Sequence, residues 1–236
     1  MSLADDLRMT GAPNMNLSEP ITSVVTTLEG QAFRVLAHTT EPLTGSAIAR
    51  LSGSGSTVGM RLALARLVEN GVVDVRKVGP SLVYTANRDH VMWPVIEALV
   101  SSADSAMERL QAAVVNSLEM QDSDSISVRD ISLAFFGSVA RGESTAASDV
   151  DVLMILPSMT IDEVTAPLVD IVSSTIARAT GNVCNVYCLT REQLTELIAR
   201  NDAMIASWLA DARTFNGSDV KRLIRTLSSA RTGDRL

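Results

Sequence analysis

The chain has 236 residues, of which 46% are hydrophobic and 20% are charged, and its formal net charge is −7. This balance excludes a disordered chain, and no apolar run reaches the roughly 18 residues that a membrane span needs. The length suits two small domains, and the acidic charge argues against a protein that only coats nucleic acid.

The first 18 residues predict a loose tail. Asp5 and Asp6 come early in it, and no apolar stretch resembles a secretory signal. Residues 19–89 then predict a first domain. Apolar residues recur there at helical spacing in three segments, which are 30–38, 44–51 and 56–70. In the last of these, Val58, Leu62, Ala65 and Val68 continue the apolar period.

Capping and turn residues sharpen this prediction. Ser54 or Ser56 is a natural N-cap for the third helix, and Asn70-Gly71 is a natural stop. Two runs that alternate apolar and polar residues, VVDVRKV and LVYTANR, flank a Gly-Pro-Ser turn and predict a hairpin.

The order helix, helix, turn, helix, hairpin resembles a winged helix-turn-helix. The stretch TGSAIARLSGSGSTVGMRLALARLVENGVVDVRKVGPSLVYTAN carries the resemblance. It implies that the helix over 56–70 faces the DNA major groove and that the hairpin touches the backbone. The expected DNA-binding residues are Ser54, Ser56, Thr57, Arg61, Arg76 and Lys77. Few of them are cationic, so we expect double-stranded DNA to be bound by a homodimer. The alternative is a domain that serves only packing or dimerisation.

Residues 90–121 keep a helical period and predict a connecting helix, either a spacer or a dimer helix. The polar run at 121–125 breaks this period, so a second domain is expected over 122–236. Its predicted elements are a strand at 131–136, a strand at 150–156, a helix at 162–179, a strand at 183–189 and further helices. Thr190 and Gln193 form a capping box for the next helix. The fold class is therefore α/β (α+β), with a small mixed sheet.

The stretch FFGSVARGESTAASDVDVLMIL at 135–156 carries the candidate chemistry. Asp149 and Asp151 are two apart in a strand, so their carboxylates share a face and repel each other unless a cation neutralises them. Hard divalent cations such as Mg²⁺ take oxygen ligands and leave positions for a substrate phosphate. Gly137 lets the backbone approach a ligand, and Ser138 offers a hydroxyl. Arg141 can contact a triphosphate or hold the loop by an ion pair.

This stretch resembles the polymerase-β-type nucleotidyltransferase signature, in which Gly-Ser is followed after ten residues by Asp-x-Asp. It is most similar to the minimal nucleotidyltransferases. The resemblance implies transfer of a nucleoside monophosphate, AMP from ATP, onto an acceptor hydroxyl. It also implies that Gly137 and Ser138 bind the triphosphate, and that Asp149 and Asp151 are catalytic ligands of Mg²⁺ or Mn²⁺.

The family commonly has a third carboxylate on a following strand. The candidate strand here, GNVCNVYCLT, contains no acid. Asn185 aligns with the missing group and is a poor base, while Glu192 beyond the strand and Asp170 on the preceding helix are alternatives.

Two functions therefore stay open. One is a Mg²⁺-dependent nucleotidyltransferase coupled to DNA binding, with an unknown acceptor. The other is a winged-helix transcriptional regulator or antitoxin-like protein that binds nucleotide with little or no turnover. A cognate toxin or another protein is a candidate partner in either case, and a small-molecule modifier would not need a DNA-binding domain.

Cys184 and Cys188 are the only cysteines in the chain. They lie four residues apart without a nearby His or third Cys, a pattern that fits neither a zinc site nor a disulfide framework. We expect two packed thiols in a reducing cytoplasm.

Overall fold

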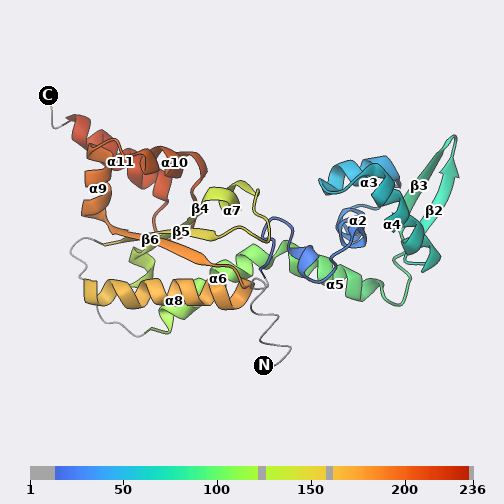
Figure 1. Cartoon of the computed structure of the whole chain (residues 1–236), viewed down its shortest axis with the longest axis horizontal. Coiled ribbons are helices and arrows are strands. Elements are labelled where there is room, and N and C mark those ends of the chain that lie inside the picture. The colour runs from blue at the N-terminus through green and yellow to red at the C-terminus, as the bar shows by residue number, and fades with distance from the viewer. Residues whose placement is uncertain (1–13, 122–125, 158–161, 234–236) are drawn as a thin grey trace, which may run out of the picture. The chain divides into compact units, whose positions relative to one another are not determined.

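A computed structural model describes residues 14–121, 126–157 and 162–233, which form two compact units (Figure 1). We call Glu19–Ala106 the helix–hairpin unit, and the described parts of 1–18 and 107–236 the sheet unit. The expected domain edge at 122 lies outside the described residues, as do residues 1–13 of the expected tail. No helix in the described part of the chain combines the length and apolar character that crossing a bilayer requires.

The helix–hairpin unit has the element order that the sequence predicts. Its elements are η1 (Pro20–Ser23), α2 (Leu28–Ala37), β1 (Leu43–Thr44), α3 (Gly45–Ser52), α4 (Thr57–Glu69), β2 (Val73–Val78), β3 (Ser81–Ala86) and α5 (Trp93–Asp104). The strands β2 and β3 form an antiparallel hairpin, and β1 pairs with β3 to give the order β1-β3-β2. Ser56 rather than Ser54 caps α4, because its Oγ accepts the Gly59 N–H at 3.0 Å.

The buried face of α4 differs from the prediction. Apolar spacing places Val58 and Leu62 in the core, yet these side chains are 65% and 58% exposed. The buried residues of α4 are instead Met60, Ala63, Leu64 and Leu67. The sequence of α4 is apolar on two faces, so its period allows either face to turn inward. Packing against α2 and α3 decides which face is buried.

The single helix expected over 90–121 is two helices. The helix α5 ends at Asp104, Ser105 is a turn residue, and α6 (Ala106–Glu119) follows. The division between the two units falls at this point, after Ala106. The helix α5 therefore belongs to the helix–hairpin unit, and α6 belongs to the sheet unit from Met107 on.

The sheet unit is built on a four-stranded mixed sheet in the order β6-β5-β4-β7. After α6 its elements are η2 (Val128–Asp130), β4 (Ser132–Phe136), α7 (Gly137–Arg141), β5 (Val150–Leu156), α8 (Asp162–Thr180), β6 (Cys184–Thr190), α9 (Arg191–Ala199), α10 (Ala203–Asp211), β7 (Arg213–Asn216) and α11 (Val220–Gly233). Strands β5 and β6 run parallel, and the other neighbouring pairs are antiparallel. The predicted strands, the helix after β5 and the capping box of α9 are confirmed.

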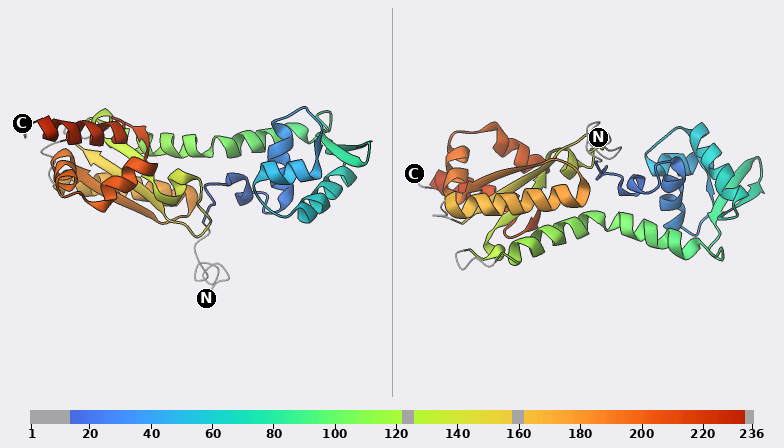
Figure 2. Two further views of the ribbon diagram at one scale, coloured as in Figure 1. Left: turned by 90° about the horizontal axis from the view of Figure 1, so that it is seen from above. Right: turned by 60° about the horizontal axis from the view of Figure 1, so that its bottom comes forward.

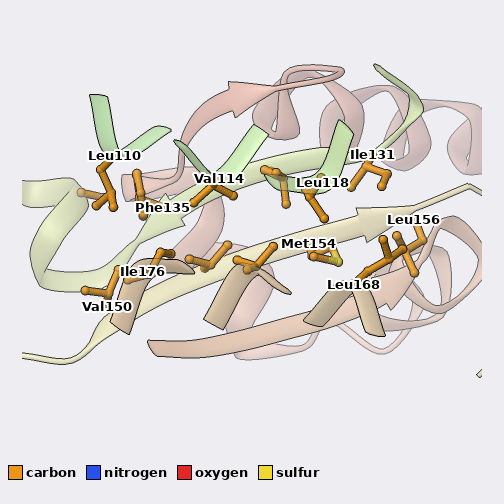
Figure 3. Packing of buried hydrophobic residues seen from close by; sticks show 14 of the residues in the cluster. Leu110, Val114, Leu118, Ile131, Phe135, Val150, Met154, Leu156, Leu168 and Ile176 are labelled. Carbon is orange, nitrogen blue, oxygen red and sulfur yellow. The ribbon is translucent and has the colours of Figure 1, made fainter. Parts of the chain in front are cut away.

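Helices cover both faces of this sheet. Val150, Val152 and Met154 of β5 pack on one face against α6 and α8. Figure 3 shows Val150 and Met154 among these side chains. Leu153 and Ile155 point to the other face, where α9, α10 and α11 cover them. Figure 2 (right) brings α6 and α8 in front of the sheet. Because β5 is buried on both faces, its sequence is a nearly unbroken apolar run.

Residues 14–18 are not loose. Leu17 is 6% exposed in the sheet core, and the Met15 N–H donates to the Asn182 Oδ1 at 3.0 Å. The Asn182 amide donates in return to the Met15 carbonyl and to the Ser148 carbonyl. Ser18 Oγ lies 2.8 Å from Ser144 Oγ. This segment therefore fastens the loop that leads to β5, a role that its own sequence does not indicate.

Candidate functional site

The two aspartates lie where β5 begins. Asp149 directly precedes the strand and is exposed, whereas Asp151 is its second residue and is half-buried. Between and beyond them, Val150 and Val152 are fully buried on the opposite face. The alternation of the strand therefore presents both carboxylates on the same side of the sheet.

Asn185 completes this group from the neighbouring strand. The parallel pairing of β5 and β6 sets Asp151 directly beside Asn185. The Asn185 Nδ2 lies 3.3 Å from the Asp149 Oδ2 and 3.3 Å from the Asp151 Oδ1. An amide thus stands where the sequence aligns a third carboxylate, and its N–H groups donate to both acids. Within the described ranges, no three His, Cys, Asp or Glu side chains gather as a metal site.

The Gly-Ser turn touches the same carboxylates. Phe136, the last residue of β4, pairs with Asp151, and Gly137 follows with a φ of 70°. A Cβ atom at Gly137 would lie 2.7 Å from the Asp151 Oδ2, so only glycine fits both the backbone conformation and the space. Ser138 comes next and is half-buried. Its hydroxyl makes no hydrogen bond to another residue that the structure describes.

Arg141 makes ion pairs at the end of this turn. Its Nε donates to the Glu143 Oε2 at 2.8 Å, and its Nη1 donates to the Asp211 Oδ2 at 2.6 Å. Hydrogen bonds with Glu143, and secondarily with Asp211, raise the pKa of Arg141. The sequence allows Arg141 either to contact a triphosphate or to hold the loop by an ion pair. The ion pairs that hold the loop are present in the structure.

Asp211 is a residue that sequence reasoning missed. It ends α10, and besides Arg141 its Oδ2 accepts the N–H of Gly137 at 3.2 Å. Its side chain is only 8% exposed. A lone aspartate 74 residues after Gly137, outside any motif, offers no sequence signal for this contact.

The two alternative acids, Glu192 and Asp170, do not lie near the aspartate pair. Strand β6 starts beside Asp151 and ends with Thr190 beside Leu156, so Glu192 follows at the far end of the sheet. Thr190 comes five positions after Asn185 in an extended strand, so the two residues lie about 16 Å apart. Asp170 lies on α8, which covers the opposite face of the sheet. Only Asn185 of the three candidates shares the site.

The two cysteines flank Asn185 as free, half-buried thiols. Burial and the nearby charge of Asp151 raise the pKa of Cys184 to about 12, and burial raises the pKa of Cys188 to about 11. Both therefore carry neutral thiols at neutral pH.

The expected DNA-binding residues occupy two kinds of position. Thr57 and Arg61 are exposed on α4, and Arg76 and Lys77 are exposed on β2. The hydroxyl of Ser54 instead donates to Glu19, and that of Ser56 caps α4. The Ser54 hydroxyl proton is therefore engaged within the unit, whereas Ser56 acts as an acceptor and remains exposed.

A pocket of about 460 Å³ lies beside Arg61 in the helix–hairpin unit. Arg61 lines one side of it, and the start of α3 and the hairpin tip at Pro80, Ser81 and Leu82 line the others. The pocket thus separates the exposed face of α4 from the hairpin.

Comparisons with known proteins bear on the sheet unit. The family model described as the nucleotidyltransferase domain matches residues 119–203. No curated protein matches the chain. Among solved structures, a crystal structure of a toxin–antitoxin with AMP-PNP is 12% identical, with a TM-score of 0.34 over 53% of this chain and 86% of that chain.

A crystal structure of a mutant of the toxin–antitoxin MntA-HpeT is 11% identical, with a TM-score of 0.35 over 53% of this chain and 88% of that chain. With TM-scores below 0.5, neither neighbour carries an argument about this chain. The family match runs from the end of α6 to the first residue of α10. The segment that is similar to the nucleotidyltransferase domain contains the Gly-Ser turn, Arg141, the aspartate pair and Asn185, but not Asp211.

Proposed function

We propose that the sheet unit transfers a nucleoside monophosphate, AMP from ATP, onto a hydroxyl of an acceptor with the help of Mg²⁺ or Mn²⁺. One observation carries the proposal: Asp149 and Asp151 present carboxylates on one side of the sheet while Gly137 packs against the Asp151 carboxylate. The match of residues 119–203 to a nucleotidyltransferase domain supports the same reaction class.

The donor set fits a hard divalent cation. Asp149 and Asp151 supply carboxylate oxygens, and neither takes part in an ion pair with a described residue that would use up its charge. Mg²⁺ prefers such oxygens and retains positions for phosphate oxygens. When bound there, the cation supplies charge stabilisation for a transferring phosphoryl group. Both aspartates would hold it.

The chain's own residues bind and orient the nucleotide. The missing side chain of Gly137 lets a phosphate approach the backbone beside Asp151, and the Ser138 hydroxyl is available as a donor. Arg141 adds a positive charge at the end of the turn, since its side chain remains 46% exposed. Together these groups would align the triphosphate next to the aspartates.

No carboxylate among the described residues stands ready to deprotonate the acceptor. The Asn185 amide occupies the third position, donates to both aspartates and cannot accept a proton at neutral pH. Losing a general base typically slows a reaction by about 10²–10⁴-fold. This observation favours, as the second candidate, a protein that binds nucleotide with little turnover.

We further propose that the helix–hairpin unit binds double-stranded DNA as a homodimer. Support comes from the element order, the exposed Arg61 of α4 and the exposed Arg76 and Lys77 of β2. The exposed Val58 and Leu62 add apolar surface to the same helix. With few cations in each copy, specific binding needs two half-sites about one helical turn apart.

The test of transfer uses the full chain, ATP labelled at the α-phosphate, Mg²⁺ and a cell lysate as the source of acceptors. Label on protein, RNA or a small molecule supports transfer, and the double variant Asp149→Asn, Asp151→Asn should abolish it. Asp170→Asn is the matched control, because Asp170 lies on a helix at the opposite sheet face. Retained labelling by the double variant would place the site elsewhere.

The test of DNA binding is a selection of bound duplexes from random DNA by the full chain. The selected sites should contain inverted half-sites, and Arg61→Ala should weaken binding to them. Arg76→Ala or Lys77→Ala should reduce the salt dependence, because these residues would contact phosphates. A monomer without sequence preference would contradict the proposal.

A further inference from the structure

Asp211 holds two groups of the Gly-Ser turn with one oxygen. The Asp211 Oδ2 accepts the Gly137 N–H at 3.2 Å and the Arg141 Nη1 at 2.6 Å. These two groups are the first backbone amide of α7 and the cation at its last residue. A single buried side chain therefore holds both ends of α7.

The sheet order explains how a residue so distant in sequence reaches the turn. In the order β6-β5-β4-β7, Asn185 lies beside Asp151, and Asp151 pairs with Phe136 of β4. On the other side of β4, Phe135 pairs with Arg213 of β7. Gly137 thus lies between Asp151 on one side and Asp211 on the other.

The position of Asp211 is unfavourable for a carboxylate on three counts. Its side chain is 8% exposed, so it loses most of its hydration. It is the last residue of α10, where the helix dipole disfavours a negative charge. Its Oδ1 is buried and has no hydrogen-bond partner among the described residues. An apolar side chain would avoid all three costs, which indicates that the carboxylate serves the site.

Arg141 shows what that charge does. Its Nε is engaged by Glu143 and its Nη1 by Asp211, which together fix the plane of the guanidinium. Its Nη2 makes no hydrogen bond to a described residue, and the side chain is 46% exposed. A guanidinium held on two edges keeps its third edge oriented and loses little conformational freedom when it binds phosphate.

We propose that Asp211 is a positioning residue for the nucleotide triphosphate. It holds the Gly137 amide so that the Gly-Ser turn stays against Asp151, and it orients Arg141 so that Nη2 faces a phosphate. The inference rests on the proposed function, which it deepens by adding a residue outside the matched segment 119–203. Asp211 touches neither nucleotide nor metal in this role and acts through Gly137 and Arg141.

The test measures the dissociation constant of ATP in the presence of Mg²⁺ for the full chain and its variants. Asp211→Asn keeps an acceptor for the Gly137 N–H but removes the charge that orients Arg141, and it should weaken ATP binding about tenfold, the equivalent of one charge-assisted hydrogen bond. Arg141→Gln should weaken it by at least as much. The double variant should be no weaker than Arg141→Gln, because Asp211 acts through Arg141.

Two controls separate positioning from stability. Asp202→Asn changes the acid at the other end of α10, where asparagine also caps a helix, and should bind ATP as the wild type does. Glu143→Gln removes the charge of the exposed partner of Arg141 but keeps an acceptor for Nε, so the guanidinium stays oriented and the dissociation constant should change less than about threefold. Arg141→Gln tests the inference even where Asp211→Asn unfolds, because the Arg141 side chain is half-exposed and a glutamine amide can still donate to Asp211.

The outcomes are distinct. A wild-type chain that does not bind ATP with Mg²⁺ overturns the proposed function and this inference with it. Wild-type binding that is unchanged in Asp211→Asn or in Arg141→Gln overturns the inference alone. Tighter binding by Asp211→Asn would mean that the carboxylate competes with phosphate, and additive losses in the double variant would mean that the two residues act separately; either result also overturns the inference.

Discussion

Asn185 and Asp151 stand side by side on parallel strands, and the Asn185 Nδ2 lies 3.3 Å from the Asp151 Oδ1. The same nitrogen lies 3.3 Å from Asp149. By donating hydrogen bonds to both carboxylates, the amide partly offsets the repulsion between them. It does so at the position where the sequence aligns the third carboxylate of the nucleotidyltransferase signature.

Replacing Asn185 with Asp should have opposite effects with and without metal. Without Mg²⁺, three carboxylates would meet and repel one another. The free energy of unfolding should then fall by up to about 1 kcal/mol, which lowers the melting temperature by roughly 2–4 °C for a chain of this size. With Mg²⁺ the repulsion is relieved, so the metal-dependent rise in melting temperature should exceed that of the wild type. Transfer of AMP should also increase. Thermal unfolding with and without Mg²⁺ and ATP measures the first effect, and equal shifts in both proteins would contradict it.

Gly137→Ala should damage the site through one added methyl group. Its φ of 70° strains any L side chain by about 1–2 kcal/mol, and its Cβ would lie 2.7 Å from the Asp151 Oδ2. Gly142→Ala is the matched control, because Gly142 has a φ of 73° and a Cβ atom added there would meet no described atom within 4 Å. Both variants should lose similar stability, but only Gly137→Ala should weaken nucleotide binding with Mg²⁺. Calorimetric titration with ATP separates them.

Asn182→Ala should destabilise the sheet unit. Its side chain is 1% exposed and bonds Met15 through both amide atoms and the Ser148 carbonyl through Nδ2. Leaving these buried groups unpaired should cost about 2–3 kcal/mol. The chain has two tryptophans, so in a Trp93→Phe background the fluorescence of Trp208 reports urea unfolding of the sheet unit. Removal of residues 1–18 should produce a comparable loss, whereas a free tail would leave the midpoint unchanged.

The ion pair of Glu29 and Arg66 predicts a pH dependence in the helix–hairpin unit. The Arg66 Nε lies 2.5 Å from the Glu29 Oε1, and this hydrogen bond lowers the pKa of Glu29 from its ordinary value of 4.5. A lowered pKa in the folded state stabilises the unit above pH 4.5, and the contribution is lost as the pH falls through the folded value. Arg66 is more than half exposed, so the contribution at pH 7 is about 1 kcal/mol or less.

Glu29→Gln should therefore lower stability at pH 7, and the difference from the wild type should shrink as the pH falls through the lowered pKa of Glu29. Unfolding followed by Trp93 fluorescence in a Trp208→Phe background measures this unit. Glu69→Gln is the control, because Glu69 is exposed on α4 and makes no ion pair with a described residue. A difference that persists unchanged at the acidic end would show that the effect is not ionic.

The sequence by itself determined the elements and the faces that follow from local rules. Strands β4, β5 and β6 and helix α8 lie where apolar runs and turn residues predict them. Asp149 and Asp151 share a face because residues two apart in a strand must do so. Capping likewise depends on neighbouring residues, so Ser56 and Thr190 are found at helix starts. These features need no knowledge of the rest of the chain.

Only the tertiary structure decided which distant groups meet. The parallel direction of β6 brings Asn185 to Asp151 and carries Glu192 to the far end of the sheet. The pairing of β7 with β4 brings Asp211 to Gly137 across 74 residues, and Asn182 reaches Met15 across 167. On α4, two apolar faces were equally compatible with the period, and packing buried Leu64 rather than Leu62. The reason is common to all of these: each contact depends on strand order, strand direction or packing partners, and local propensity and spacing carry none of that information.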